Sequence, residues 1–401
     1  MANYLIPRDE YLKKISPFVD KQLIKIITGQ RRVGKSYILK LLIKQISSKH
    51  PDANIIYIDM ELHEFSTIST DKEFYRYVEA RLIATQPNYL FVDEVQEIEG
   101  FERCLRSLLN EATCDIYCTG SNAKMLSGEL ATLLAGRYIE FPIHSLSYPE
   151  FLEFNQIRES AQNLNHYLTL GGMPYQYNLG LEKPVVFEYL KSLYSTILLR
   201  DVVARENIRN VSFLENLVAY LADNVGSLFS AQNISKYLKS QRINIPTQSV
   251  INYLKGLTNA YFVHKVPRAE VGGLKIFEIG DKFYFEDLGL RNCVRSYNFK
   301  EDVSKLMENV IYLHLLRKGY QVYIGKMGDK EIDFMAEKEG EKIYIQVAYL
   351  LADANTIKRE FDSLLQIEDQ FPKYVITMDE SNIHHSHKGI KRLNLREFLL
   401  E

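Results

Sequence analysis

The eight residues 29–36, with the sequence GQRRVGKS, limit the choice of fold more than any other part of the sequence. They match the pattern G-x-x-x-x-G-K-[ST], in which a glycine-rich loop wraps around phosphate groups. The apolar residues 23–28 before the loop predict a buried strand, and the apolar residues after Lys35 predict a helix. Strand, loop and helix therefore follow one another in the order that a phosphate-binding loop requires.

The residue types in this loop have distinct chemical roles. Gly29 and Gly34 let the backbone bend so that its N–H groups face the phosphates, Lys35 reaches the β and γ oxygens, and the Ser36 hydroxyl ligates Mg²⁺. The predicted cofactors are therefore ATP and Mg²⁺. The residues expected to bind the nucleotide are Gly29, Gln30, Arg31, Arg32, Val33, Gly34, Lys35, Ser36 and Tyr37.

A second apolar run, residues 87–94, ends in two carboxylates. We expect Asp93 to hold the metal and Glu94 to polarise the attacking water. The alternative is a solvated acidic turn, because the acidity continues beyond Glu94. A third apolar run, residues 115–119, precedes Ser121 and Asn122, which are expected either to sense the γ-phosphate or to cap the next helix.

Several segments of the chain together resemble a known family. They are GQRRVGKS, LFVDEVQ, CTGSNAKMLSGELATLLAGRY, HSLSYPEF, YLTLGGMPY, LLRDVVAREN, KFYFEDLGLRN and KEIDFMAEKEGEKIYIQVAYLL. These stretches are similar to those of bacterial and archaeal ATPases of the AAA+ superfamily that carry a C-terminal restriction-endonuclease-like domain. The resemblance covers nearly the whole chain, and it implies that Arg137 contacts the γ-phosphate as a catalytic arginine. An ordinary surface arginine is the alternative.

A chain of 401 residues is too long for one hydrophobic core and predicts two or three domains. The expected fold class is α/β. The expected segments are an AAA+ P-loop ATPase domain with a parallel sheet at residues 1–150, a helical lid or connector at 151–210, a winged-helix module at 211–295 and a restriction-endonuclease-like α/β domain at 296–401. The sheet of the first segment is expected to contain strands at residues 24–28, 54–59, 89–93, 115–119 and 138–141.

Charge and hydropathy bear on whether this protein binds nucleic acid or a membrane. The net charge of −2 gives no bulk support for nucleic-acid binding, so any DNA contact must come from a local patch. No stretch approaches the ~18 uninterrupted apolar residues of a membrane span. We therefore expect a cytoplasmic protein with no membrane contact.

The middle segment has the pattern of three helices followed by a hairpin, which is the plan of a winged helix. The helices are expected near residues 213–221, 231–238 and 247–257, and the strands at 261–266 and 275–279 around Gly272 and Gly273. Polar residues on the third helix and cations on the hairpin are of types that suit DNA contacts. These residues are Gln248, Ser249, Asn252 and Lys255 on the helix, and Lys265, Arg268 and Lys275 on the hairpin. A packing or regulatory role for the module is equally compatible with the sequence.

The last hundred residues predict the element order helix, three strands, helix, strand. The expected helices are residues 303–316 and 357–365, and the expected strands are 321–324, 331–336, 342–347 and 374–377. This order resembles the restriction-endonuclease-like core, and Asp333 matches its first metal-binding carboxylate. Glu308 lies inside the first expected helix, and the alternative is that Glu308 and Asp333 are ordinary surface residues. Gln346 stands where the second acid belongs and Ala348 where the lysine belongs, which argues against phosphodiester hydrolysis.

The sequence therefore favours an Mg²⁺-dependent ATPase that uses its nucleotide state to rearrange its domains, with DNA as the expected partner. The alternative is a nucleotide-controlled switch or scaffold whose partner is another protein or a second copy of the chain. A third possibility, an ATP-gated nuclease, conflicts with Gln346 and Ala348.

Overall fold

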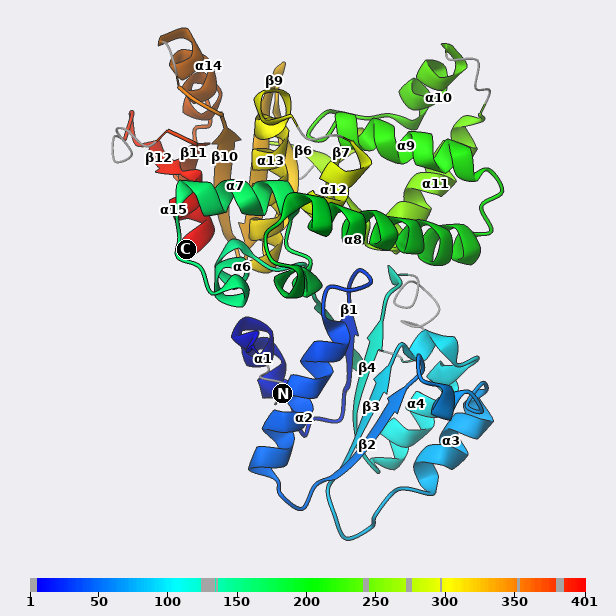
Figure 1. The fold of residues 1–401 in the computed structure, drawn as a ribbon. Helices are drawn as coiled ribbons and strands as arrows, with labels where there is room; N and C mark the ends of the chain where they lie inside the picture. Colours follow the sequence, from blue (N-terminus) through cyan, green and yellow to red (C-terminus); the bar gives the residue numbers. More distant parts are fainter. Residues whose placement is uncertain are drawn as a thin grey trace. The chain divides into compact units, whose positions relative to one another are not determined.

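The computed structural model describes residues 6–123, 134, 136–240, 245–271, 276–295, 298–351, 354–379 and 386–401. The chain forms two compact units (Figure 1). The first comprises Met1–His144 with Asn259–Tyr261, and the second comprises Ser145–Thr258 with Phe262–Glu401.

The first unit is built on a five-stranded sheet in the order β2-β3-β4-β1-β5, and every neighbouring pair is parallel. The strands are β1 (Ile24–Thr28), β2 (Asn54–Asp59), β3 (Asn88–Asp93), β4 (Asp115–Gly120) and β5 (Tyr138–Pro142). The predicted parallel sheet is confirmed, and each strand begins and ends within one residue of its expected position.

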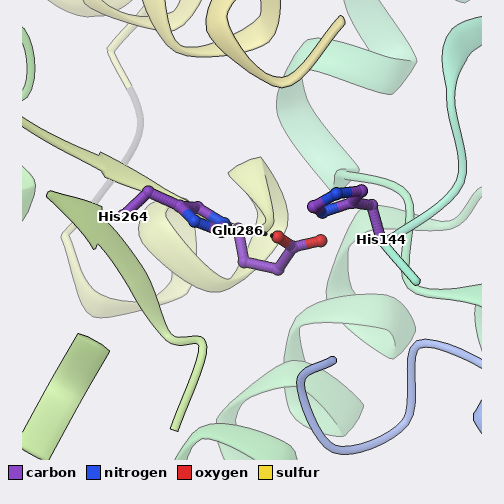
Figure 2. A group of neighbouring side chains, drawn as sticks. All are labelled: His144, His264 and Glu286. Carbon is purple, nitrogen blue, oxygen red and sulfur yellow. Dashed lines mark hydrogen bonds and ion pairs between the residues drawn. The ribbon is translucent and has the colours of Figure 1, made fainter. Parts of the chain in front are cut away.

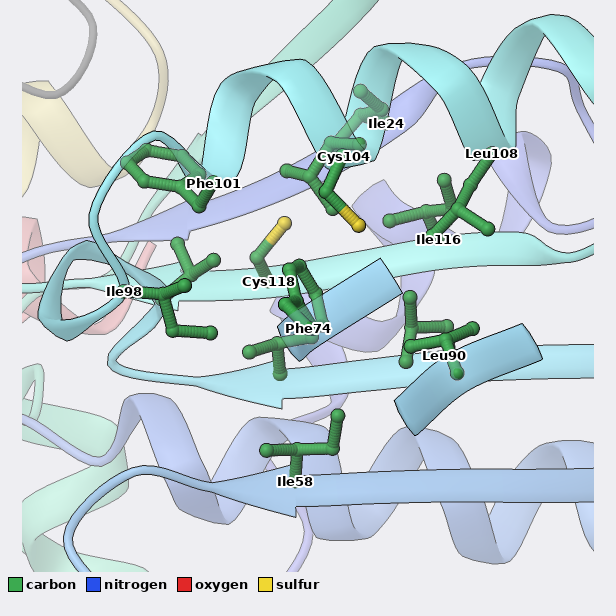
Figure 3. Close-up of a cluster of buried hydrophobic side chains, with 14 of the residues drawn as sticks. Ile24, Ile58, Phe74, Leu90, Ile98, Phe101, Cys104, Leu108, Ile116 and Cys118 are labelled. Carbon is green, nitrogen blue, oxygen red and sulfur yellow. The ribbon is translucent and has the colours of Figure 1, made fainter. Parts of the chain in front are cut away.

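Helices cover both faces of this sheet (Figure 1). They are α1 (Asp9–Ile15), α2 (Lys35–Lys49), α3 (Asp71–Glu79) and α4 (Phe101–Glu111), with short 3₁₀ turns at Ser16–Phe18, His63–Phe65 and Val95–Glu97. Alternate strand residues such as Leu90 and Cys118 point toward α3 and α4, where they pack against Phe74 and Cys104 (Figure 3). Successive side chains of a strand point to opposite faces, so the remaining strand residues face the other layer of helices.

The second unit begins with helices. They are α6 (Tyr148–Asn155), α7 (Ala161–Leu170), α8 (Lys183–Thr196), α9 (Val211–Asp223), α10 (Ala231–Ser240), α11 (Thr247–Asn259) and α12 (Leu288–Val294), with a 3₁₀ segment at Pro174–Leu179 and a π-helix at Ile197–Ala204. The three helices expected in the middle segment correspond to α9, α10 and α11. Among the described helices of the chain, none is both long and apolar enough to cross a membrane.

A seven-stranded sheet completes the second unit in the order β12-β11-β10-β9-β8-β6-β7. Its strands are β6 (Val263–Glu270), β7 (Ile276–Phe285), β8 (Gln321–Met327), β9 (Lys330–Lys338), β10 (Glu341–Val347), β11 (Lys373–Thr377) and β12 (Lys391–Asn394). The remaining helices are α13 (Phe299–Arg317), α14 (Ala354–Leu365) and α15 (Leu395–Leu400). The expected order of helix, three strands, helix and strand is present from α13 to β11.

The hairpin β6–β7 is part of the same sheet as the C-terminal strands. Strand β6 pairs with β7 in antiparallel orientation and with β8 in parallel orientation, through the pairs Arg268 with Ile324 and Glu270 with Lys326. The segment boundary that we expected between residues 295 and 296 therefore falls inside one continuous sheet. The turn residues Gly272 and Gly273 and the cation Lys275 lie outside the described residues.

A polar network joins the start of the second unit to this sheet. His264 on β6 lies with its Nε2 atom 2.6 Å from Oε2 of Glu286, which follows β7 and is buried (Figure 2). The other carboxylate oxygen of Glu286 accepts a hydrogen bond from the Ser145 N–H at 2.8 Å, and Arg317 on α13 donates to the Ser145 carbonyl at 3.0 Å. His144, also drawn in Figure 2, is the last residue of the first unit's main segment.

Candidate nucleotide-binding site

The loop between β1 and α2 adopts the backbone conformation that its glycines permit. Gly29 has φ 141° and Gly34 has φ 101°, both in the region that side chains rarely adopt. A Cβ atom on Gly29 would lie only 2.2 Å from the carbonyl oxygen of Ile143, so this position accepts no side chain. Arg32, at φ 72°, adopts a left-handed conformation without being glycine, a form of strain that is concentrated at functional sites.

Lys35 lies at the first position of α2 and is buried. Its ammonium donates hydrogen bonds to the carbonyl oxygens of Gly29 at 3.1 Å and Gln30 at 3.2 Å. It also lies 3.5 Å from Oε1 of Glu94 at the end of β3. The cation is therefore held between its own loop and the acidic end of β3.

One hydroxyl group contacts both residues at the end of β3, through the carboxylate of Asp93 and the backbone of Glu94. Thr119 on the neighbouring strand β4 donates its hydroxyl hydrogen to Asp93, and the same oxygen accepts the backbone N–H of Glu94 at 2.8 Å. Tyr57 on β2 contacts the second oxygen of Asp93 at 3.4 Å. Asp93 therefore lies between side chains of both adjacent strands.

Asp93 also accepts a hydrogen bond from the Ser36 hydroxyl. Burial raises the pKa of Asp93, and the hydrogen bonds from Ser36 and Thr119 oppose that increase. A serine hydroxyl beside a buried carboxylate is a pair of hard oxygen donors, which Mg²⁺ prefers. The residues present therefore fit the Mg²⁺ that the loop implies.

Glu94 is held in an unusual backbone conformation, with φ 55°. Its carboxylate accepts a hydrogen bond from the Ser121 hydroxyl at 2.9 Å and another from the Gln96 amide. Burial alone would raise the pKa of Glu94, but the Lys35 ammonium and the hydrogen bonds from Gln96 and Ser121 lower it to about 2. Glu94 is thus an ionised carboxylate with defined partners, and it does not form part of a solvated acidic turn.

The other residues of the loop have separate roles in the structure. Val33 is buried, and its carbonyl accepts a hydrogen bond from the buried Arg8 at 2.9 Å. Arg31 forms an ion pair with Glu61 at 2.9 Å, and the Tyr37 hydroxyl donates to the carbonyl of Ile6 at 2.9 Å. The contacts of Arg8 and Tyr37 attach the segment that precedes α1 to the loop and to α2, and the ion pair of Arg31 attaches the loop to the residues after β2.

Gln30 is fully buried, and neither polar atom of its side chain has a hydrogen-bond partner among the described residues. A buried amide without partners costs free energy of roughly 1–3 kcal/mol per group. Such a cost is ordinarily offset by a role in function, and this orphaned amide lies in the loop that is expected to bind the phosphates.

Two further predicted site residues lie in different surroundings. Asn122 is half-buried and directly follows Ser121, which contacts Glu94. Arg137 is exposed, donates to the Asn110 side chain, and accepts the N–H of Ile24 at the start of β1. The loop follows the other end of β1, about 15 Å away at 3.3 Å per strand residue. Arg137 therefore cannot contact a phosphate bound to the loop of its own chain.

The residues predicted to face DNA are only partly exposed. On α11, Gln248, Asn252 and Lys255 are exposed. On the hairpin, Lys265 is exposed but forms an ion pair with Asp281 at 3.0 Å, and Arg268 lies half-buried on a strand that pairs on both sides. A cavity of about 610 Å³ between α11 and the hairpin is lined by Lys255 and Lys265 together with apolar residues such as Ile251 and Phe283.

The sequence indicated the residues that carry the motif, but not those that orient them. Thr119, Tyr57, Gln96 and Arg8 were not predicted. Thr119 reaches Asp93 because β3 and β4 are neighbours with Val92 opposite Cys118, and this register is not visible in either segment alone. The run of small polar residues at the end of β4 was the one available signal.

Comparisons with known proteins agree with these observations in the first unit. The family model of the AAA domain matches residues 21–152, and a domain of unknown function matches residues 161–301. An uncharacterized protein of Haemophilus influenzae is 33% identical over 383 residues, which cover 94% of each chain. An uncharacterized protein of Methanocaldococcus jannaschii is 30% identical over 347 residues, covering 83% of this chain and 76% of that protein.

Among solved structures, that of the Aeropyrum pernix ORC1 protein in complex with DNA is similar to this chain with a TM-score of 0.35 and 9% identity. It covers 76% of this chain and 97% of that chain. A similarity at this level carries no argument about function.

Proposed function

This chain belongs to the same family as the Haemophilus influenzae protein, and its residues 21–152 match the AAA domain, so we propose that it is an ATPase that requires Mg²⁺. The observation that best supports this proposal is the meeting of Lys35, Asp93 and Glu94 at the carboxyl end of the parallel sheet. Ser36 and Asp93 would hold the Mg²⁺, whose charge would offset that of the phosphates. Lys35 would contact the β- and γ-phosphate oxygens.

Glu94 would polarise the attacking water. Its ion pair with Lys35 offers a way for nucleotide binding to change the basicity of this carboxylate. In its present contacts the carboxylate is a weak base, because the nearby ammonium lowers its pKa. When Lys35 contacts phosphate oxygens instead, that influence weakens and the pKa of Glu94 rises. A higher pKa makes the carboxylate a better acceptor of a proton from water.

Nucleotide affinity tests the proposal. Replacing Lys35 with alanine should weaken ATP binding by about 100-fold or more, because a charge-assisted hydrogen bond contributes roughly 1.5–3 kcal/mol and Lys35 would make at least two. Lys40, an exposed lysine on the same helix, provides the control variant Lys40→Ala. The affinities are to be measured by titration of a fluorescent ATP analogue. Equal affinity of Lys35→Ala and wild type would refute the assignment of the site.

We further propose that nucleotide state acts on the second unit and that DNA is its partner, contacted through a winged helix formed by α9–α11 and the hairpin β6–β7. The order of three helices and a hairpin, with exposed Gln248, Asn252 and Lys255 on the third helix, supports this. The ion pair of Lys265 with Asp281 and the apolar lining of the adjacent cavity favour instead a protein partner. ATP turnover with duplex, single-stranded and branched DNA at low salt separates the two proposals. If DNA stimulates ATP turnover, and if Lys255→Glu reduces this stimulation while Lys49→Glu leaves it unchanged, DNA is the partner. If none of the DNA molecules stimulates turnover, a protein partner is supported.

For the C-terminal segment we propose a restriction-endonuclease-like core that does not cleave DNA. Asp333, which matches the first metal-binding carboxylate, lies on β9, and Glu308 lies on α13. Gln346 on β10 turns its amide oxygen toward the backbone N–H of Asp333, at 3.4 Å, and Ala348 offers no polar group. These residues do not fit a catalytic Mg²⁺ centre.

A further inference from the structure

Four charged side chains of the second unit meet where β7, α13 and β9 pack together. The Nζ atom of Lys282 on β7 lies 2.9 Å from Oε1 of Glu331, 3.5 Å from Oε2 of Glu308 and 3.9 Å from Oδ1 of Asp333. The side chain of Lys282 is 2% exposed. One ammonium group is therefore surrounded by three carboxyl groups and removed from water.

The charges in this cluster depend on one another. Burial alone would lower the pKa of Lys282, but the nearby carboxyl groups of Glu308, Asp333 and Glu331 raise it, so the ammonium stays charged. Burial raises the pKa of Asp333 and of Glu308, whose negative charges also repel each other. Removing the ammonium would leave the buried Asp333 and the half-buried Glu308 and Glu331 without a cation, which is destabilising.

The rest of the cluster fixes the carboxyl groups in place. Tyr284, which is fully buried on the same strand as Lys282, donates its hydroxyl hydrogen to Glu308 at 3.1 Å. The backbone N–H of Val347 donates to Asp333 at 2.8 Å. Hydrogen-bond donors thus come from β7 and β10, and the cation comes from the hairpin.

We propose that the ammonium of Lys282 takes the place of the divalent cation in the nuclease-like centre. One of its three partners, Asp333, matches the first metal-binding carboxylate of such a core, and Gln346 stands in place of the second. Glu308, on the first helix of the core, supplies another carboxylate to the same cluster. The ammonium of Lys282 is thus the cation that occupies this acidic site, and its ion pairs connect β7 to α13 and β9. This inference rests on the proposed restriction-endonuclease-like core and is independent of the ATP site.

The proposal is tested by Mn²⁺ binding to the full chain without nucleotide, followed by electron paramagnetic resonance and by thermal unfolding. Wild type should show no Mn²⁺ site that depends on Asp333. The variant Lys282→Met should unfold at a lower temperature and gain a saturable Mn²⁺ site. At Mn²⁺ concentrations 100-fold above its dissociation constant, the unfolding temperature of this variant should rise by about 5 °C. The double variant Lys282→Met/Asp333→Asn should show neither the Mn²⁺ site nor the rise in unfolding temperature with Mn²⁺.

Two outcomes would overturn the proposal. One is Mn²⁺ binding by wild type that Asp333→Asn abolishes, since the metal would then share the site with Lys282. The other is a folded Lys282→Met variant that gains no Mn²⁺ affinity. If Lys282→Met does not fold, the comparison of wild type with Asp333→Asn decides: binding that depends on Asp333 refutes the proposal, and its absence supports it. Loss of ATP binding in Lys35→Ala is unaffected by either result, so a failure of the ATPase proposal is distinguishable.

Discussion

Thr119 shows how one side chain sets the geometry of two others. Its hydroxyl donates to Asp93 and accepts from the backbone of Glu94, so a single group positions the two consecutive residues that we propose for metal binding and water polarisation. The left-handed backbone of Glu94 turns the chain sharply after Asp93, which places consecutive residues in different surroundings. Conformations of this kind cost of order 1–3 kcal/mol and persist where neighbouring contacts enforce them.

The variant Glu94→Gln should bind ATP and hydrolyse it at least ~100-fold more slowly, because an amide keeps the shape of the carboxylate but accepts no proton from water. The affinity should be retained, since the amide still accepts a hydrogen bond from Ser121. The measurements are single-turnover hydrolysis and nucleotide retention. Glu97→Gln, at an exposed carboxylate three residues further on, is the matched control. Unchanged hydrolysis in Glu94→Gln would transfer the role to another residue.

At this scale the sequence predicted the residues whose chemistry is fixed by a motif. Lys35, Ser36, Asp93 and Glu94 lie together because the strands that carry them end at the same side of a parallel sheet. The burial of Gln30 and the contacts of Lys282 were not predictable in the same way. Gln30 carries no signal of its burial, and Lys282 meets Glu308 and Glu331 only through the packing of distant segments.

Among the elements, the loop between α9 and α10 depends on a close approach to α13. Gly226 has φ 76°, and a Cβ atom there would lie 2.5 Å from Oε2 of Glu308. The Glu308 carboxylate is held by Lys282 and Tyr284, so it cannot move away without breaking those contacts. A side chain at residue 226 therefore disturbs the cluster as well as the loop.

Replacing Gly226 with alanine should destabilise the second unit more than the same change at Gly340. Both glycines have a positive φ, 76° and 86°, but a Cβ atom on Gly340 would meet nothing within 4 Å. The two substitutions therefore cause similar backbone strain. The difference between their effects on stability reports the contact of the new Cβ atom with Glu308. We expect a difference of about 1–3 kcal/mol in the free energy of unfolding, the usual cost of overpacking. Urea denaturation of both variants checks this, and equal stabilities would show that Glu308 moves freely.

The strands and helices differ in how far the sequence could define them. The five strands of the first unit were predictable because each is an apolar run that is bounded by polar residues or a turn. The strand β6 was expected to end at residue 266, but it continues past Pro267 to Glu270 after a register shift. A proline interrupts a ladder of hydrogen bonds, so the continuation depends on the pairing of β6 with β8. The short elements α12, β12 and α15 have too few residues to show a periodicity.

At the scale of the whole molecule, the position of Arg137 bears on assembly. Because it lies at the end of the sheet away from its own loop, its proposed catalytic role requires a second copy of the chain. A mixture of the variants Lys35→Ala and Arg137→Ala should then hydrolyse ATP faster than the two variants measured separately and added. In the mixed assembly, the Lys35→Ala chain supplies the arginine and the Arg137→Ala chain supplies the intact loop. The pair Lys35→Ala with Arg106→Ala, an exposed arginine on α4, is the control, since Arg106→Ala alone should retain turnover. Full activity of Arg137→Ala by itself would make Arg137 an ordinary surface residue.

The pairing of β6 with β8 also determines which parts of the chain can fold when they are separated from the rest. A chain cut after Arg295 would retain the hairpin but lose the strand that covers the outer side of β6. Uncovered backbone N–H and C=O groups of a strand attract other chains and lead to aggregation. The loss of Glu308, Glu331 and Asp333 would at the same time leave Lys282 without its partners. The helices that carry the expected DNA-facing residues are therefore best studied together with the C-terminal strands, as a single folding unit.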